Sequence, residues 1–187
     1  MKPTTSEEKF IEEFLLENEA NLKTAFLIRK VMPKIIHNKV IEIREALIKT
    51  CESWDGFEVN QEKADWSFDR NYNCFIRIKM KKWPIVFVKI ENQSKGFNNM
   101  IIGVVGRDQK HISQNIDSQC LDNEVGKLNI GSLKSSRAWF VYTQRQDFKG
   151  ENDFNTLERI FFDTENLVKD LADDLHQIAI ALDKSIK

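Results

Sequence analysis

The sequence predicts an α+β fold in which helices flank an antiparallel sheet. The first third has no glycine before Gly56 and places apolar residues at helical spacing. The middle third changes to alternating apolar and charged residues, which is typical of half-buried strands. The chain then ends in a long amphipathic helical pattern. We therefore expect N-terminal helices, a central antiparallel sheet of about five strands, and a long C-terminal amphipathic helix packed on that sheet.

The N-terminal region begins with a capping box, because Thr5 is followed three residues later by Glu8. Pro33 lies inside the next helical pattern and predicts a kink or a break near Met32, since proline lacks a backbone donor. The apolar residues of this pattern are spaced three or four positions apart, or multiples of these, and mark one helix face: Leu22, Phe26, Ile36, Val40, Ile43 and Leu47.

The strands of the middle region are joined by short links, which favours an antiparallel meander. Lys82-Trp83-Pro84 is expected to form a tight turn between the first two of the longer strands. The polar stretch 107–136 is treated as an excursion from the sheet, with room for a short helix. The expected strands are Phe75–Met80, Ile85–Ile90, Met100–Val105 and Ala138–Thr143, with shorter candidates at Phe57–Val59 and Trp66–Phe68.

The C-terminal region carries the clearest helical stripe, which Asp163 or Thr164 is expected to cap. Its apolar members are Leu167, Val168, Leu171, Leu175, Ile178, Leu182 and Ile186. The expected organisation is one domain over residues 1–187. It contains a helical segment 1–52, a sheet region 53–145 with the excursion 107–136, and a helical segment 154–187.

Charge and cysteine content exclude several classes of protein. The 28 basic and 29 acidic residues give a net charge of -1, which argues against a dedicated nucleic-acid coat or a polybasic membrane binder. Cys51, Cys74 and Cys120 are far apart and are expected to be reduced structural thiols. The sequence has no secretory signal pattern and no apolar run long enough to span a bilayer, so we expect a cytoplasmic protein with no membrane partner.

Known catalytic patterns are absent from the sequence. His37, His111 and His176 lie in no metal-binding spacing, and no nucleophile elbow occurs. The glycines Gly103 and Gly106 are not followed by the lysine of a phosphate loop. The strand lysines have no carboxylate two positions before them, as a PD-(D/E)xK nuclease site requires. We therefore expect no catalytic residue, no metal ligand, no cofactor and no enzymatic activity.

A basic strand face is the strongest candidate for nucleic-acid binding. Cations on a strand can bind a phosphate backbone, especially beside aromatic residues. A solvated strand face with lysines that discourage edge pairing is the alternative interpretation. The candidate residues are Arg77, Lys79 and Lys81 on one strand, Lys82 in the adjacent turn and Lys89 on the neighbouring strand.

The N-terminal helices favour protein contact, because their apolar stripe is longer than a small sheet needs. Val40, Ile43 and Leu47 are the candidate contact residues, with a protein partner or self-association as the expected interaction. Nucleic-acid binding through the basic strand face is the main alternative. A degenerate nuclease-like enzyme with a site in 107–136 is the second alternative.

The order of elements resembles one protein family. A helical region ending near Trp54 precedes the strand pair Phe75–Lys79 and Trp83–Glu91, then the aromatic strand Trp139–Tyr142 and a closing helix that ends Ile180–Asp183. Over residues 20–187 this is similar to the C-terminal region of bacterial PD-(D/E)xK nuclease-family proteins, without their catalytic portion. The resemblance implies a non-enzymatic accessory module linked to bacterial defence or mobile elements.

Overall fold

The structure is a computed structural model that describes residues 5–60, 74–92, 99–106, 114–128, 130, 133–136, 139–145, 149 and 153–187. The chain divides into two compact units, Met1–Asn38 and Lys39–Lys187. The boundary falls inside a long helix, which ends at Glu52, where the predicted helical segment also ends. Each unit is described by itself.

The first unit consists of helix α1, Ser6–Glu17, and the first part of helix α2, Glu19–Glu52. The predicted capping box is present: the Thr5 hydroxyl accepts from the Glu8 amide at 3.2 Å, and the Glu8 carboxylate accepts from the Thr5 amide at 2.7 Å. Of the kink or break predicted near Met32, a break is not found, since α2 continues as helix through Pro33. A 34-residue helix has many other backbone hydrogen bonds and tolerates the loss of one.

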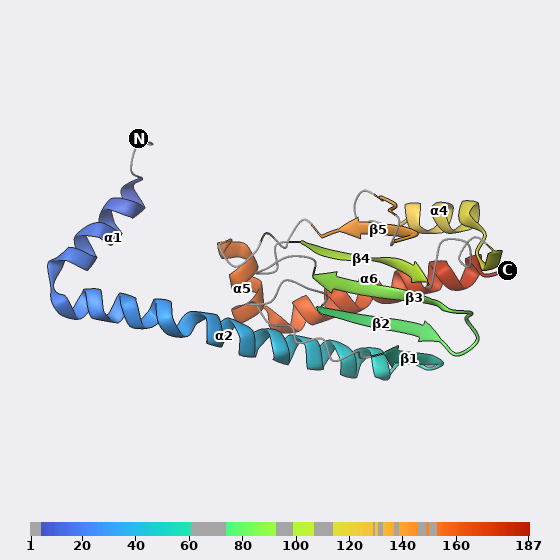
Figure 1. The fold of residues 1–187 in the computed structure, drawn as a ribbon, viewed down its shortest axis with the longest axis horizontal. Coiled ribbons are helices and arrows are strands. Elements are labelled where there is room, and N and C mark those ends of the chain that lie inside the picture. Colours follow the sequence, from blue (N-terminus) through green and yellow to red (C-terminus); the bar gives the residue numbers. More distant parts are fainter. Residues whose placement is uncertain are drawn as a thin grey trace. The chain divides into compact units, whose positions relative to one another are not determined.

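The second unit contains the predicted antiparallel sheet, whose strands follow one another in the order β1-β2-β3-β4-β5 (Figure 1). The expected strand Trp66–Phe68 lies outside the described residues. The register brings apolar residues of successive strands together, with Ile78 opposite Val88 and Val88 opposite Val104. One sheet face is therefore an apolar layer. The strands are β1 Phe57–Asn60, β2 Cys74–Met80, β3 Val86–Asn92, β4 Met100–Gly106 and β5 Val141–Gln144.

Helix α6, Thr164–Ser185, covers this apolar layer and contacts β2, β3 and β4 (Figure 1). Leu167, Leu171 and Leu175 are fully buried, so the predicted stripe is the core face of the helix. The amphipathic C-terminal helix packed on the sheet is thus confirmed. The predicted segment 154–187 contains a second helix, α5, Phe154–Phe162.

Helix α4, Ser118–Gly126, lies in the stretch that was predicted as an excursion, and it packs against α6. The Asp117 side chain caps it by accepting from the Cys120 amide at 3.0 Å. Leu121 and Val125 are buried on its inner face. The excursion therefore adds a helix to the core of the second unit.

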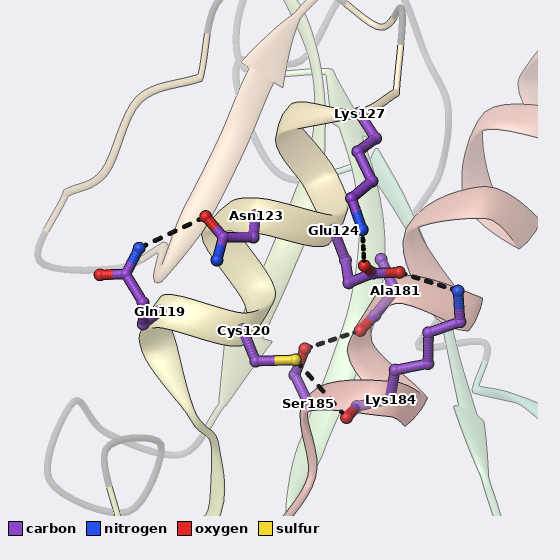
Figure 2. A network of polar contacts seen from close by, with 8 residues as sticks. All are labelled: Gln119, Cys120, Asn123, Glu124, Lys127, Ala181, Lys184 and Ser185. Carbon is purple, nitrogen blue, oxygen red and sulfur yellow. Dashed lines mark hydrogen bonds and ion pairs between the residues drawn. The ribbon is translucent and has the colours of Figure 1, made fainter.

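A polar network joins α4 to α6 (Figure 2). The Glu124 carboxylate accepts from the Lys184 ammonium at 2.8 Å and also pairs with Lys127. The Cys120 thiol donates to the carbonyl of Lys184 at 3.7 Å. Hydrogen bonds from Lys127 and Lys184 lower the pKa of Glu124 to about 2. Both bonds require the carboxylate form, so they hold the two helices together most strongly above acidic pH.

Candidate protein-contact surface

The predicted contact residues Val40, Ile43 and Leu47 lie inside the second unit. Their exposed fractions are 1%, 3% and 0%. Side chains buried in the chain's own core are not available to a partner while the fold persists, so the structure removes them as a contact surface. The physical reason is that an apolar stripe has the same sequence pattern whether it faces its own core or another protein.

The N-terminal members of the same stripe are exposed. Leu22 and Phe26 have exposed fractions of 55% and 68%, and α1 contains no buried residue. We name the exposed large apolar side chains of the first unit the N-terminal apolar surface. Its members are Phe10, Ile11, Phe14, Leu16, Leu22, Phe26, Leu27, Ile28, Val31, Met32 and Ile35. Sequence patterning marked several of these residues as apolar but did not identify them as exposed.

The two helical segments of the first unit carry opposite charge. Helix α1 contains five glutamates and one lysine, Lys9. Residues 20–38 of α2 contain no acidic residue and four basic ones: Lys23, Arg29, Lys30 and Lys34. Acidic residues favour the N-terminal part of a helix, but that preference extends over the first turn alone. The segregation therefore marks two chemically distinct surfaces in this unit.

Arg77, Lys79 and Lys89 share the sheet face opposite α6, because Arg77 pairs directly with Lys89 and lies two positions from Lys79. The Lys79 ammonium is 3.3 Å from a carboxylate oxygen of Glu58 on β1. Lys89 pairs with the buried Glu91 and lies 5.4 Å from the centre of the Trp139 ring. These cations are brought together as predicted, but acidic neighbours already compensate the lysines.

The remaining candidate cations are Arg77 and the two lysines of the turn after β2. The Arg77 guanidinium lies over the Phe87 ring, 5.0 Å from its centre. Lys82 donates to Asp183 of α6 at 2.9 Å. Lys81 is not on the strand of Arg77 and Lys79 as predicted, because β2 ends at Met80, and it lies exposed in the turn. Asp183 also accepts from the Trp83 indole at 2.8 Å. Burial alone would raise the pKa of Asp183, but these two hydrogen bonds lower it.

Two cavities of the second unit differ in the titratable groups among their described lining residues. A cavity of about 650 Å³ has these described residues in its lining: Asp122 of α4, Leu133, Lys134, Ser135, Ser136, Phe140 and Val141. A groove of about 240 Å³ between α2 and α6 includes His176, whose ring is 4.7 Å from that of Trp54. The Thr50 hydroxyl in this groove donates to the carbonyl of Ala46 at 2.9 Å. Within the part of the chain that the structure describes, no cluster of histidine, cysteine and carboxylate groups is suited to a metal ion.

Comparisons with protein-family models, with curated proteins and with solved structures found no match. Among the described residues, no helix is long and apolar enough to cross a membrane. The described part of the chain consists of a five-stranded antiparallel sheet covered by α6 and a helical unit that carries an exposed apolar surface.

Proposed function

We propose that this chain is a non-enzymatic protein-contact module whose first unit binds a protein through the N-terminal apolar surface. The observation that carries the proposal is the exposure of large apolar side chains along both helical segments of that unit, from Phe10 at 68% to Ile35 at 46%. The second unit, with its closed core, serves as the support.

The energetics favour contact with a protein. Complete burial of one large apolar side chain contributes roughly 1.5–3 kcal/mol, so a few of these residues supply a useful binding free energy even after losses of chain and rotational entropy. Amphipathic helices commonly bind by placing apolar residues, spaced three and four positions apart, into a groove. Phe10 with Phe14, Leu22 with Phe26, and the series Leu27, Val31 and Ile35 have this spacing.

Nucleic-acid binding through the basic strand face remains the main alternative, but the contacts of that face weigh against it. Phosphate binding would have to displace Glu58 from Lys79 and Glu91 from Lys89. If this face does bind nucleic acid, fluorescence anisotropy of labelled DNA and RNA will show affinity that falls steeply with salt and is lost in the Arg77→Glu/Lys79→Glu variant. No binding at low salt removes the alternative.

The wider biological setting is also a proposal. It rests on the resemblance of residues 20–187 to PD-(D/E)xK accessory regions and places the module in the cytoplasm, in bacterial defence or mobile-element systems.

The test is site-specific photo-cross-linking. A benzophenone amino acid replaces Phe26 in the N-terminal apolar surface, and the matched control replaces Phe162 of α5, which is 85% exposed in the second unit. The expected result is a protein adduct from position 26 in cells that express the chain, with none from position 162. The absence of any intermolecular adduct from position 26, or equal adducts from both positions, contradicts the proposal.

A further inference from the structure

We infer that the partner of the N-terminal apolar surface is a second copy of this chain, and that α1 of each copy packs on residues 22–35 of α2 in the other. The inference rests on the proposed function and assigns its partner. It is carried by three features of the first unit: the corner between the helices, the opposite charge of the two segments, and the order of apolar and charged rows on each helix.

The corner prevents α1 from packing on its own α2. The two helices are separated by Asn18 alone, whose backbone is extended with φ -160 and ψ 162. Two antiparallel neighbouring helices need a connection of about 2–5 residues. Helix α1 therefore meets α2 at an angle and does not return along it (Figure 1).

Hydrogen bonds hold this corner in place. The Asn18 side chain caps α2 by accepting from the Asn21 amide at 2.9 Å. The Asn21 side chain donates to the carbonyl of Phe14 at 2.9 Å and to the carboxylate of Glu17 at 3.0 Å. The end of α1 and the start of α2 are thus joined by side chains from both helices. Opening the corner into a hairpin would cost these contacts.

The charges of α1 and of residues 20–38 of α2 indicate which helix each of them would pack against. Helix α1 has an excess of glutamate, and residues 20–38 of α2 have basic residues without any acidic one. Two like-charged helices disfavour packing on each other, whereas an acidic helix beside a basic one is favoured. A second copy supplies both: its α1 complements this α2, and its α2 complements this α1.

The rows on α1 fit this arrangement. Phe10, Ile11, Phe14 and Leu15 form one apolar stripe, because residues four apart lie above one another on a helix. Glutamates border the stripe on both sides, with Glu8 and Glu12 along one edge and Glu13 and Glu17 along the other. A helix that docks by this stripe therefore brings carboxylates to both margins of the contact.

The rows on α2 are complementary. Lys23, Lys30 and Lys34 are seven and four positions apart and lie along one side of the helix. An apolar row runs beside them, with members at spacings of four: Leu27, Val31 and Ile35. An incoming α1 that covers this apolar row places one of its glutamate margins next to the lysine row. Each copy places its α1 on the other copy's α2, so the assembly is a closed two-fold dimer and does not extend into a chain of further copies.

Two charge-reversed variants test the inference. One carries Glu12→Lys/Glu13→Lys on α1, and the other carries Lys30→Glu/Lys34→Glu on α2. All four side chains are exposed. Lysine and glutamate have similar helix propensities, so both variants keep the helices. The control, Glu45→Lys/Glu158→Lys, makes the same charge change as the α1 variant at two exposed positions of the second unit.

The measurement is molar mass by light scattering and sedimentation velocity, over a roughly hundredfold range of concentration. The wild type and the control are expected to dimerise. Each reversed variant alone is expected to lose affinity by roughly 10- to 100-fold, because every substituted contact occurs twice in a two-fold dimer. An equimolar mixture of the two reversed variants is expected to regain the dimer mass, since each reversed α1 then meets an α2 of opposite charge.

Restoration in the mixture is specific to exchange between copies, because packing within one chain gains nothing from mixing. A wild type that stays monomeric at every concentration, a dimer insensitive to both reversals, or a mixture that stays monomeric each overturns the inference. A monomeric wild type that still gives a protein adduct from position 26 overturns the second-copy assignment and leaves the proposed contact function standing. A monomer without an adduct overturns both.

Discussion

Leucine-to-alanine substitutions at two positions of helix α2 are expected to differ strongly in their effect on the free energy of unfolding. Leu47 is fully buried in the second unit, whereas Leu27 has an exposed fraction of 52% in the first. We predict that Leu47→Ala strongly destabilises the second unit and that Leu27→Ala leaves its free energy of unfolding nearly unchanged. The two positions belong to one helix, so helix propensity contributes equally to both changes.

The magnitude follows from burial. Truncation of a buried leucine to alanine costs about 2–5 kcal/mol, since the transfer free energy is lost and a cavity remains. For a protein of this size each kcal/mol lowers Tm by about 2–4 °C, so Leu47→Ala is expected to lower Tm by about 4–20 °C. At Leu27 the lost contact is small and alanine is the better helix former, so the change stays within about 0.5 kcal/mol.

Urea denaturation followed by tryptophan fluorescence measures both variants at the same protein concentration. All four tryptophans of the chain occur in the second unit, and Trp83 and Trp139 are buried in it. The fluorescence therefore reports the unfolding of that unit. A Leu47→Ala midpoint within error of the wild type, or an equal loss in Leu27→Ala, would refute the division of α2 into a core half and an exposed half.

Three further predictions concern the second unit. Gly103→Ala is expected to lower the free energy of unfolding by about 1–3 kcal/mol in a thermal or urea melt, because an added Cβ would lie 2.1 Å from the Val141 carbonyl oxygen of the neighbouring strand. The stability that Glu124 contributes is expected to be complete above its ordinary pKa of 4.5 and to be lost as pH falls toward about 2. The difference in Tm between the wild type and Glu124→Gln should therefore shrink over that range. A difference in Tm that stays constant contradicts the prediction. Cys51 is expected to resist iodoacetamide while the half-buried Cys120 reacts, since burial raises the pKa of the Cys51 thiol to about 12. Peptide mass spectrometry of the native protein measures both alkylation rates. Equal rates contradict the expectation.

Local pattern was sufficient to predict most of the secondary structure. The capping box at Thr5 and the apolar stripe of α6 depend on residues within a few positions of one another, so they can be predicted from local sequence. The short helix inside 107–136 was allowed for but not located, because its apolar residues, Leu121 and Val125, make too short a stripe. Of the kink or break expected at Pro33, the break does not occur, since a long helix outweighs one unfavourable position.

The candidate sites depended on contacts between residues far apart in the sequence. Lys82 and Asp183 are 101 positions apart, and no local pattern predicts that they pair. Local pattern placed Arg77 and Lys79 on one strand, but it did not reveal the carboxylates that pair with these cations and their neighbours. The burial of the candidate contact residues Val40, Ile43 and Leu47 was not foreseen for the same reason.

The sequence by itself determined the periods of the elements, the order of helices and strands, and the charge of each helix, because all of these are properties of near neighbours. The tertiary structure decided which apolar residues became core and which stayed exposed. It placed Leu47 inside the second unit and left Phe26 at the surface, although both belong to one stripe. Burial depends on what packs against a face, and that is decided by parts of the chain far away in the sequence.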